Sequence, residues 1–350
     1  MPILIVLLAL LAGAPCALAD ASAVSAVSVA PARRDSTVVR PDSTVVRPDS
    51  AVVRPDFASA DTLPLRFART ASVGSGGGAA ERLIEPAGVA VDAFGRLYVS
   101  DAALNRVQRY DAAGGWLGGA GTLGSAPDQL RRPGAVATLG HFGVAVLDCE
   151  NRRVVSYDLQ GRLAGTLIDL DAAALRAQVG YVDPVALATD RGGAVVIADA
   201  DHDRLLTFDF SGRYLRTIGG FGARGGSFRS LSGVAWGPRG EFVTSDRAHS
   251  RIQRLDADGR ELGGWALAIG RGRGALAVAV DDSSRIAVAD ELTGQMWLYD
   301  ASGRLLARAE GCAAPRALAF APDGTLLVAE SRAGRVSRWS LAPPGVPRSN

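Results

Sequence analysis

Histidine is the side chain best suited to metal binding or proton transfer near neutral pH, and the sequence holds three of them. Two lie in similar contexts, His202 in DADHD and His249 in RAHS. With Asp201, Asp203 and Arg247 they form a candidate metal or ligand cluster, because imidazole and carboxylate groups ligate divalent cations. The alternative interpretation is that both histidines occupy a variable loop position of a repeated unit and bind nothing.

A second set of ionisable residues recurs at intervals of between 40 and 51 residues. Each acidic residue closes a short apolar run, and a catalytic group is normally needed only once, so six copies indicate a structural role. We expect each carboxylate to accept backbone and arginine hydrogen bonds inside its own unit; a ring of carboxylates that binds cations is the alternative. The acidic residues are Asp101, Asp148, Asp199, Asp246, Asp290 and Glu330, and the expected arginine partners include Arg106, Arg153, Arg204 and Arg251.

The recurring unit consists of short strands separated by turns. In residues 86–124, PAGVAV, RLYVSD and RVQRYD are joined by DAFG and AALN, and WLGGAGTLG is a looser fourth strand after DAAGG. Four antiparallel strands in about forty residues are typical of one propeller blade. The exception is residues 171–178, DAAALRAQ, where Asp171 is a candidate N-cap for a short helix.

Six units predict six blades, but the last unit, ALAFAPDGTLLVAESRAGRVSRWS, holds only three strands. Residues 63–74, LPLRFARTASVG, match GRYLRTIGGFG, which closes the third unit. We therefore expect the N-terminal strand to complete the last blade and remove the exposed sheet edges. The predicted fold is an all-β six-bladed β-propeller, with four antiparallel strands per blade, over residues 62–342.

The residues before and after the repeats predict export and a spacer. Residues 1–19 are typical of a signal peptide, with cleavage after Ala19; a retained anchor or a lipid on Cys16 is the alternative. Residues 20–61 are expected to be a disordered spacer, because the proline in each STVVRPD repeat excludes a helix. Residues 343–350 form a C-terminal tail. The expected location is secreted or periplasmic, or else anchored by the N-terminus to the outer face of a membrane.

The repeated units resemble the NHL repeat family of six-bladed propellers. The matching features are the strand-ending Asp, the N-R-V triplet at residues 105–107 and the aromatic-Asp pair at residues 110–111. The resemblance covers about residues 63–340 and is weakest in the last two blades, where Gly-Gln (294–295) and Gly-Arg (334–335) replace Asn-Arg. The family includes protein-binding, RNA-binding and sensor domains, so the resemblance implies a fold rather than one function.

Structural relatives of this family include peptide-amidating lyases and lactonase-like hydrolases, and they imply a metal in the central channel held by His, Asp or Glu. Here the innermost strands read GVAVD, AVATL, VALAT, GVAWG, LAVAV and ALAFA, and their first carboxylates are Asp92 and Asp281 at strand ends. His141, in LGHFG, is expected in a turn on the opposite face. The sequence therefore predicts no catalytic residue, no metal and no cofactor.

Function is then expected in the variable loops between blades, on the face that also carries the turns between second and third strands. Arginines beside aromatic side chains on a rigid rim favour binding of a protein, a peptide or an anionic glycan; an ordinary solvated rim is the alternative. The candidate binding residues are Arg131, Arg132, Arg224, Arg229, Arg247, Arg316, Phe221, Phe228, His202 and His249, with Arg271, Arg273 and Tyr181 beside them.

Charge and composition narrow the expected partners. The 38 basic and 36 acidic residues leave a net charge of +2 without a block of like charges, so we expect no nucleic-acid partner and membrane contact only through an uncleaved or lipidated N-terminus. Cys149 and Cys312 are expected to be free thiols, and the protein to be a monomer. The favoured function is an exported, non-enzymatic binding, scaffold or sensor module; the alternative is a periplasmic metal-dependent lyase or lactonase-type hydrolase.

Overall fold

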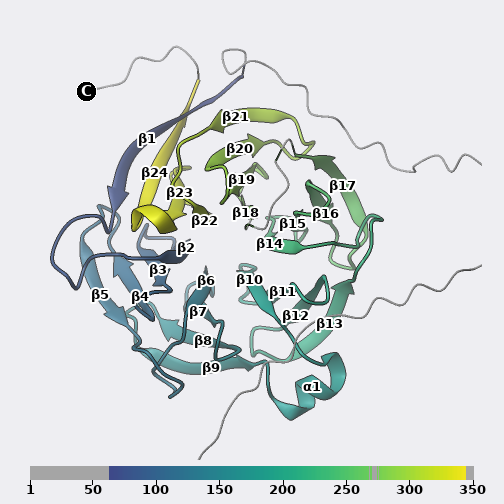
Figure 1. Ribbon diagram of the computed structural model, residues 1–350, viewed down its shortest axis with the longest axis horizontal. Coiled ribbons are helices and arrows are strands. Elements are labelled where there is room, and N and C mark those ends of the chain that lie inside the picture. The colour runs from purple at the N-terminus through teal and green to yellow at the C-terminus, as the bar shows by residue number, and fades with distance from the viewer. Residues whose placement is uncertain (1–62, 268, 270–273, 275, 344–350) are drawn as a thin grey trace, which may run out of the picture. The chain divides into compact units, whose positions relative to one another are not determined.

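Six antiparallel sheets of four strands each are arranged as blades around a common axis in the computed structural model of the chain (Figure 1). The structure describes residues 63–267, 269, 274 and 276–343. The predicted all-β six-bladed propeller is confirmed. The expected signal peptide, the spacer, all but the first residue of the tail, Arg271 and Arg273 lie outside the described residues.

Each blade places its strands in the same order from the axis outward. The innermost strands are β2 (Pro86–Val91), β6 (Pro133–Thr138), β10 (Pro184–Thr189), β14 (Leu231–Trp236), β18 (Leu276–Val280) and β22 (Pro315–Phe320). The second strands, each ending at one of the predicted acidic residues, are β3 (Leu97–Asp101), β7 (Gly143–Asp148), β11 (Val195–Asp199), β15 (Phe242–Asp246), β19 (Ile286–Asp290) and β23 (Leu326–Glu330).

The third and outermost strands complete the blades. The third strands are β4 (Arg106–Tyr110), β8 (Arg153–Asp158), β12 (Arg204–Phe208), β16 (Arg251–Leu255), β20 (Gln295–Tyr299) and β24 (Arg335–Ala342). The outermost strands are β5 (Trp116–Ala120), β9 (Leu163–Asp169), β13 (Tyr214–Gly219), β17 (Glu261–Ala266), β21 (Leu305–Ala309) and β1 (Arg66–Val73). We call the face with the inter-blade loops and the second-to-third-strand loops the loop face, and the opposite face, with the other turns, the turn face.

The N-terminal strand completes the last blade, as predicted. β1 pairs antiparallel with β24, from Arg66 opposite Ala342 to Val73 opposite Val336, and Figure 1 shows the purple strand outside the yellow one. The register shifts by one residue between Arg69 and Ala71, as in a β-bulge, which is common at sheet edges. Joining the two ends of the chain in one sheet closes the ring and covers the edge of β24.

Small residues allow the innermost strands to meet around the axis. Neighbouring innermost strands contact each other in sequence, and β22 contacts β2. A Cβ atom added at Gly88 on β2 would lie 2.5 Å from the carbonyl oxygen of Gly134 on β6, and one at Gly233 on β14 would lie 2.6 Å from that of Leu276 on β18. Glycine is therefore required there because the adjacent backbones approach too closely for a side chain.

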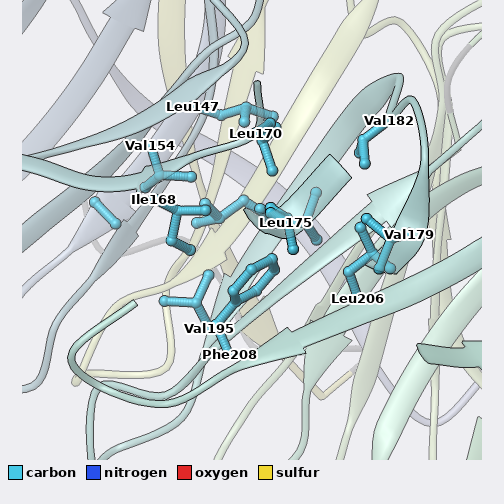
Figure 2. Packing of buried hydrophobic residues seen from close by; sticks show 13 residues of the cluster. Leu147, Val154, Ile168, Leu170, Leu175, Val179, Val182, Val195, Leu206 and Phe208 are labelled. Carbon is cyan, nitrogen blue, oxygen red and sulfur yellow. The ribbon is translucent and has the colours of Figure 1, made fainter. Parts of the chain in front are cut away.

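Apolar side chains from adjacent blades pack between the sheets (Figure 2). Between the second and third blades, Leu147 and Ile168 pack with Val195 and Phe208, and the helix α1 (Ala173–Val179) adds Leu175 and Val179 to this cluster. The helix that the sequence predicted is therefore present, anchored by its apolar face.

The predicted N-cap of α1 is wrong. The N-cap residue is Ala172, without a side-chain cap hydrogen bond. Asp171 instead accepts two hydrogen bonds from Nε of Arg152, both at 3.0 Å, because the loop brings a cation from the preceding blade within reach. A 3-10 turn, η2 (Ser331–Ala333), connects β23 to β24. Among the described residues no helix is long and apolar enough to cross a membrane.

Candidate functional site

A cavity of about 390 Å³ lies at the loop-face end of the central channel. Its walls come from the beginnings of the innermost strands, with small or apolar residues such as Gly88, Ala186 and Val234. Its mouth adds residues from the second-to-third-strand loops, including Cys149 and Glu150. The walls themselves thus offer shape and backbone groups, and the charged side chains are confined to the mouth.

The charged residues of the mouth form a continuous chain of ion pairs across four blades. Nη2 of Arg132 lies 3.0 Å from Oε1 of Glu85, and Nη1 of Arg316 lies 2.9 Å from the same atom. Nε of Arg316 lies 2.8 Å from Oε1 of Glu291, and Nε of Arg132 lies 3.9 Å from Oε1 of Glu150. These partly exposed pairs alternate in sign, which orients charged groups at the rim without a large net field.

The opposite side of the mouth, on the third and fourth blades, is uncharged. The lining there consists of residues such as Pro184, Val185 and Ser232. Asp183 precedes this wall, and its pKa is raised, first by burial and then by the neighbouring Asp201 and Asp199. A ligand in the cavity would therefore meet alternating charges on one side and a neutral wall on the other.

The loop between the third and fourth blades carries an exposed aromatic and two arginines. Phe221 is 74% exposed, and the guanidinium of Arg229 lies 5.9 Å from the centre of its ring. Arg224 is also exposed. A rigid, accessible aromatic ring with a cation beside it is the composition that recurs at the centres of protein interfaces.

Two predicted binding residues are not at the surface, and their assignment is corrected. Phe228 is fully buried in the core between the third and fourth blades, whereas Phe221, its partner in an isolated parallel bridge, is exposed. Arg247 is also buried, and its Nη1 donates to Oδ1 of Asp290 at 2.7 Å. That contact joins the fourth and fifth blades, so Arg247 helps to hold the ring together.

The two histidines of the candidate cluster each contact a residue of their own blade. Nδ1 of His202 lies 2.9 Å from Oδ2 of Asp199, and Nδ1 of His249 lies 2.7 Å from Oδ2 of Asp246. Each histidine thus contacts the acidic residue of its own blade. Over the described part of the chain there is no group of three or more His, Cys, Asp or Glu residues arranged to hold a metal ion. His141 lies in the turn between β6 and β7, on the turn face.

The six strand-ending acidic residues are all buried and bind the loops around them. Asp148, for example, accepts from the backbone N–H of Arg131 at 2.7 Å, from the side-chain amide of Asn151 at 2.7 Å and from Nε of Arg153 at 2.9 Å. Asp199 and Asp246 bind Arg204 and Arg251 in the same way. Each such network connects the inter-blade loop to the second-to-third-strand loop, so it fixes the position of these two loops relative to each other.

In the first and fifth blades the side chain of the acidic residue accepts no hydrogen bond from the first residue of the third strand among the described residues, and the last blade adds a second cation. Asp101 accepts from the backbone N–H groups of Ile84 at 2.6 Å and Leu104 at 3.0 Å, whereas Arg106 donates to the carbonyl of Ala80 at 2.9 Å. Glu330 accepts from Arg335 at 3.0 Å and lies 3.4 Å from Nη2 of Arg69 on β1. The hydrogen bonds from its partners hold the pKa of Glu330 below its usual value although burial opposes this. The N-terminal strand thus supplies a cation to the last blade.

Several residues of the loop face were not identified from the sequence. Glu85, Glu150 and Glu291 complete the ion pairs of the mouth. Glu150 and Glu291 could have been noticed in the sequence, because they follow a strand-ending acidic residue by two residues and by one residue. Leu123 is exposed in a bridge to Leu130 that matches the Phe221 loop. This similarity of the two inter-blade loops, GTLG and GGFG, was visible in the sequence.

The two cysteines among the described residues, Cys149 and Cys312, are free thiols, as expected. Cys149 lines the channel cavity, and burial raises the pKa of its thiol to about 12. Burial likewise raises the pKa of the Cys312 thiol to about 12. Since the thiolate is the reactive form, neither side chain is prepared for nucleophilic chemistry.

Comparison with known proteins supports the fold. No protein-family model matches the sequence, and no curated protein matches it. A streptogramin B lyase structure is similar with a TM-score of 0.53 and 9% identity, over 81% of this chain and 100% of that chain. A virginiamycin B lyase from Staphylococcus aureus gives a TM-score of 0.52 and 12% identity, over 81% of this chain and 89% of that chain.

A protein of unknown function from Bacteroides thetaiotaomicron is similar at a TM-score of 0.55 and 13% identity, over 79% of this chain and 76% of that chain. These identities are low, so the similarity supports the propeller fold and does not establish an activity.

Proposed function

We propose that this protein is an exported, non-enzymatic binding module of the NHL type, which takes a protein or peptide partner on its loop face. The observation that carries the proposal is the combination, on one face, of a shaped cavity with an ionic rim and accessible apolar and aromatic side chains beside arginines. Such a surface offers a pocket for a side chain or terminus together with anchors around it.

The proposed contact surface consists of two features of the loop face. The first is the channel mouth, with Arg132 and Arg316 and their acidic partners. The second is the patch formed by Phe221, Arg224 and Arg229 on the loop between the third and fourth blades. Arg132 and Arg316 are already paired, so they contribute orientation and specificity, whereas Phe221 contributes apolar area, which is the larger part of binding free energy.

The similarity to lyases does not by itself favour an enzymatic function. One of the similar structures is a catalytically inactive Staphylococcus aureus virginiamycin B lyase in which a histidine is replaced by alanine, with quinupristin bound. Among the described residues that line the cavity, none is a histidine. A stoichiometric metal in the purified protein, removed by chelation together with a measurable activity, would favour the enzymatic alternative.

The proposal is tested with two matched double variants. Phe221→Ser with Arg229→Ser removes the loop-face anchor, whereas Phe210→Ser with Arg213→Ser removes a phenylalanine of the same exposure, 74%, and a nearby arginine from the turn face. In quantitative pull-downs from an extract of the source cells, we expect the first variant to retain at least tenfold less of the specific partner. We expect the second to retain the wild-type amount; equal retention by both variants would refute the loop face as the binding surface.

Export is tested on the N-terminus of the protein. If residues 1–19 are a signal peptide, intact-mass measurement of the protein recovered outside the cytoplasm should give a chain that begins at Asp20. Retention of Met1, or a lipid mass on Cys16, would instead support an anchored form. The same preparation supplies the material for the pull-down.

A further inference from the structure

Arginines on the turn face connect one blade to the next in a repeated way. In each case the guanidinium donates to the carbonyl of the residue that follows the aspartate of the next blade's third-to-fourth-strand turn. At three of the junctions this contact joins the outer part of one blade to the next blade. The pairs are Arg109 with Leu159 at 3.2 Å, Arg216 with Ala257 at 2.6 Å and Arg254 with Ala301 at 2.7 Å.

Where the last blade meets the first, the corresponding arginine and carbonyl both lie in the described part of the chain, but no hydrogen bond joins them. Arg338 in RVSRW of β24 has the same place as Arg109 in RVQRY and Arg254 in RIQRL. The corresponding acceptor on the first blade is the carbonyl of Ala112, which follows Asp111. Among the described residues, Nη2 of Arg338 is buried and has no hydrogen-bond partner. This junction is the one at which the ring is closed by the N-terminal strand.

A second cavity, of about 280 Å³, lies at this junction, and we call it the seam cavity. Arg338 and Ala112 both line it. Its other walls are mainly apolar and come from the turns and strand ends of the first and last blades. They include Val91, Phe94, Leu97, Pro322 and Leu327. A pocket of this size fits a small ligand, since sites for drug-sized molecules begin at about 300 Å³.

We propose that the seam cavity binds a small monocarboxylate with an apolar tail, with the carboxylate on Arg338. A guanidinium N–H without a partner carries a desolvation cost, which an anionic acceptor removes when the Arg338 side chain turns Nη2 toward the cavity that it lines. Apolar walls then favour a hydrocarbon or ring over a polar body. Because the seam cavity lies on the turn face, this site is separate from the proposed function of the loop face.

The one acidic residue in the lining sets the charge of the ligand. Asp323 is exposed, and its Oδ1 accepts from the backbone N–H of Thr325 at 2.9 Å. The Asp323 carboxylate is therefore held by a hydrogen bond within its own turn and lies toward solvent. Its negative charge at the cavity repels a ligand with two negative charges, such as a dianion or a phosphate. A single negative charge next to Arg338 and a neutral tail against Phe94 satisfy both constraints.

The test is calorimetric titration of the purified protein with sodium hexanoate, octanoate and decanoate below their micellar concentrations. Each added methylene should lower Kd about fourfold until the cavity is filled. Octanoate should bind about 10- to 100-fold more tightly than 1-octanol, which lacks the charge, because a hydrogen bond to a charged group is lost. No saturable heat with any carboxylate, or equal affinity for octanoate and 1-octanol, would overturn the proposal.

Three variants locate the binding. Arg338→Gln should lower octanoate affinity at least tenfold, and Ala321→Leu, which adds bulk to the cavity wall, should do the same. Arg308→Gln, the same change at an exposed arginine of the fifth blade, should leave the affinity unchanged. Undiminished octanoate binding by both Arg338→Gln and Ala321→Leu would place the carboxylate elsewhere and refute the site. Should either variant fail to fold, the comparison of octanoate with 1-octanol on the wild-type chain still decides.

Discussion

A chain that lacks residues 1–74 should lose the cooperative unfolding transition of the full-length protein. Without β1, the edge of β24 is exposed, and the rings of Phe67 and Trp339, whose centres lie 6.3 Å apart, no longer pack. Burial of Val73 alone contributes about 1.5–3 kcal/mol, and Glu330 also loses the cation of Arg69. Together with the lost strand pairing, the total approaches the whole stability of a typical domain, about 5–15 kcal/mol.

Thermal denaturation followed by circular dichroism measures this effect. The matched control is a chain that lacks residues 1–62 and keeps β1, which should unfold within about 2 °C of the full-length protein. A synthetic peptide of residues 63–74 should restore part of the transition when added to the truncated chain. A truncated chain that still unfolds cooperatively near the normal temperature would show that ring closure contributes little.

The variant Arg247→Met should destabilise the propeller by about 3–5 kcal/mol. The side chains of Arg247 and Asp290 are 4% and 0% exposed, and the 2.7 Å contact joins two blades. Removing the guanidinium leaves a buried carboxylate without its cation, which costs more than the pair itself contributes. Asp290 keeps the backbone N–H of Leu292 and the hydroxyl of Thr293 as donors, so the loss should be limited to this range.

Urea denaturation of three variants separates this effect from a general surface effect. Arg260→Met removes an arginine that is 80% exposed in a pair with Asp256, and it should change the unfolding free energy by less than about 0.5 kcal/mol. Adding Asp290→Asn to Arg247→Met should recover part of the loss, because the uncompensated charge is removed. If Arg247→Met unfolds like Arg260→Met and instead weakens partner binding, Arg247 is a surface residue after all.

Much of the fold could be predicted because its signals are local and repeated. The acidic residue at each second strand and the Asp-Gly turns define strand ends within a few residues, and six copies reinforce one another. The same repetition exposed the missing strand of the last blade and its counterpart at residues 63–74. The N-cap of α1 was mispredicted because Asp171 accepts a hydrogen bond from Arg152 of the preceding blade. The residues next to Asp171 in the sequence do not indicate this contact.

The candidate site was less predictable from the same residues. The sequence indicated an arginine-rich loop face, and the arginines of the mouth, Arg132 and Arg316, do lie there. Their acidic partners lie on three different blades. Two of these partners follow a strand-ending acidic residue by one or two positions, but that spacing does not indicate which arginine each one pairs with. Phe228 and Arg247 each lie in a loop of the loop face and are of the same residue types as the exposed candidates. Their burial could therefore not be predicted from the sequence.

The sequence by itself determined the number of blades, the order of strands and the need for the chain ends to meet, because turn chemistry and apolar alternation act over a few residues and repeat. Only the tertiary structure decided which loop side chains point to solvent, which charges pair across the mouth, and that Nη2 of Arg338 has no hydrogen-bond partner among the described residues at the seam. Those outcomes depend on neighbouring blades, whose contacts join residues tens to hundreds of positions apart. Whether a loop side chain is buried or paired depends on the residues of the neighbouring blade that contact it, and the sequence around that side chain does not specify those residues.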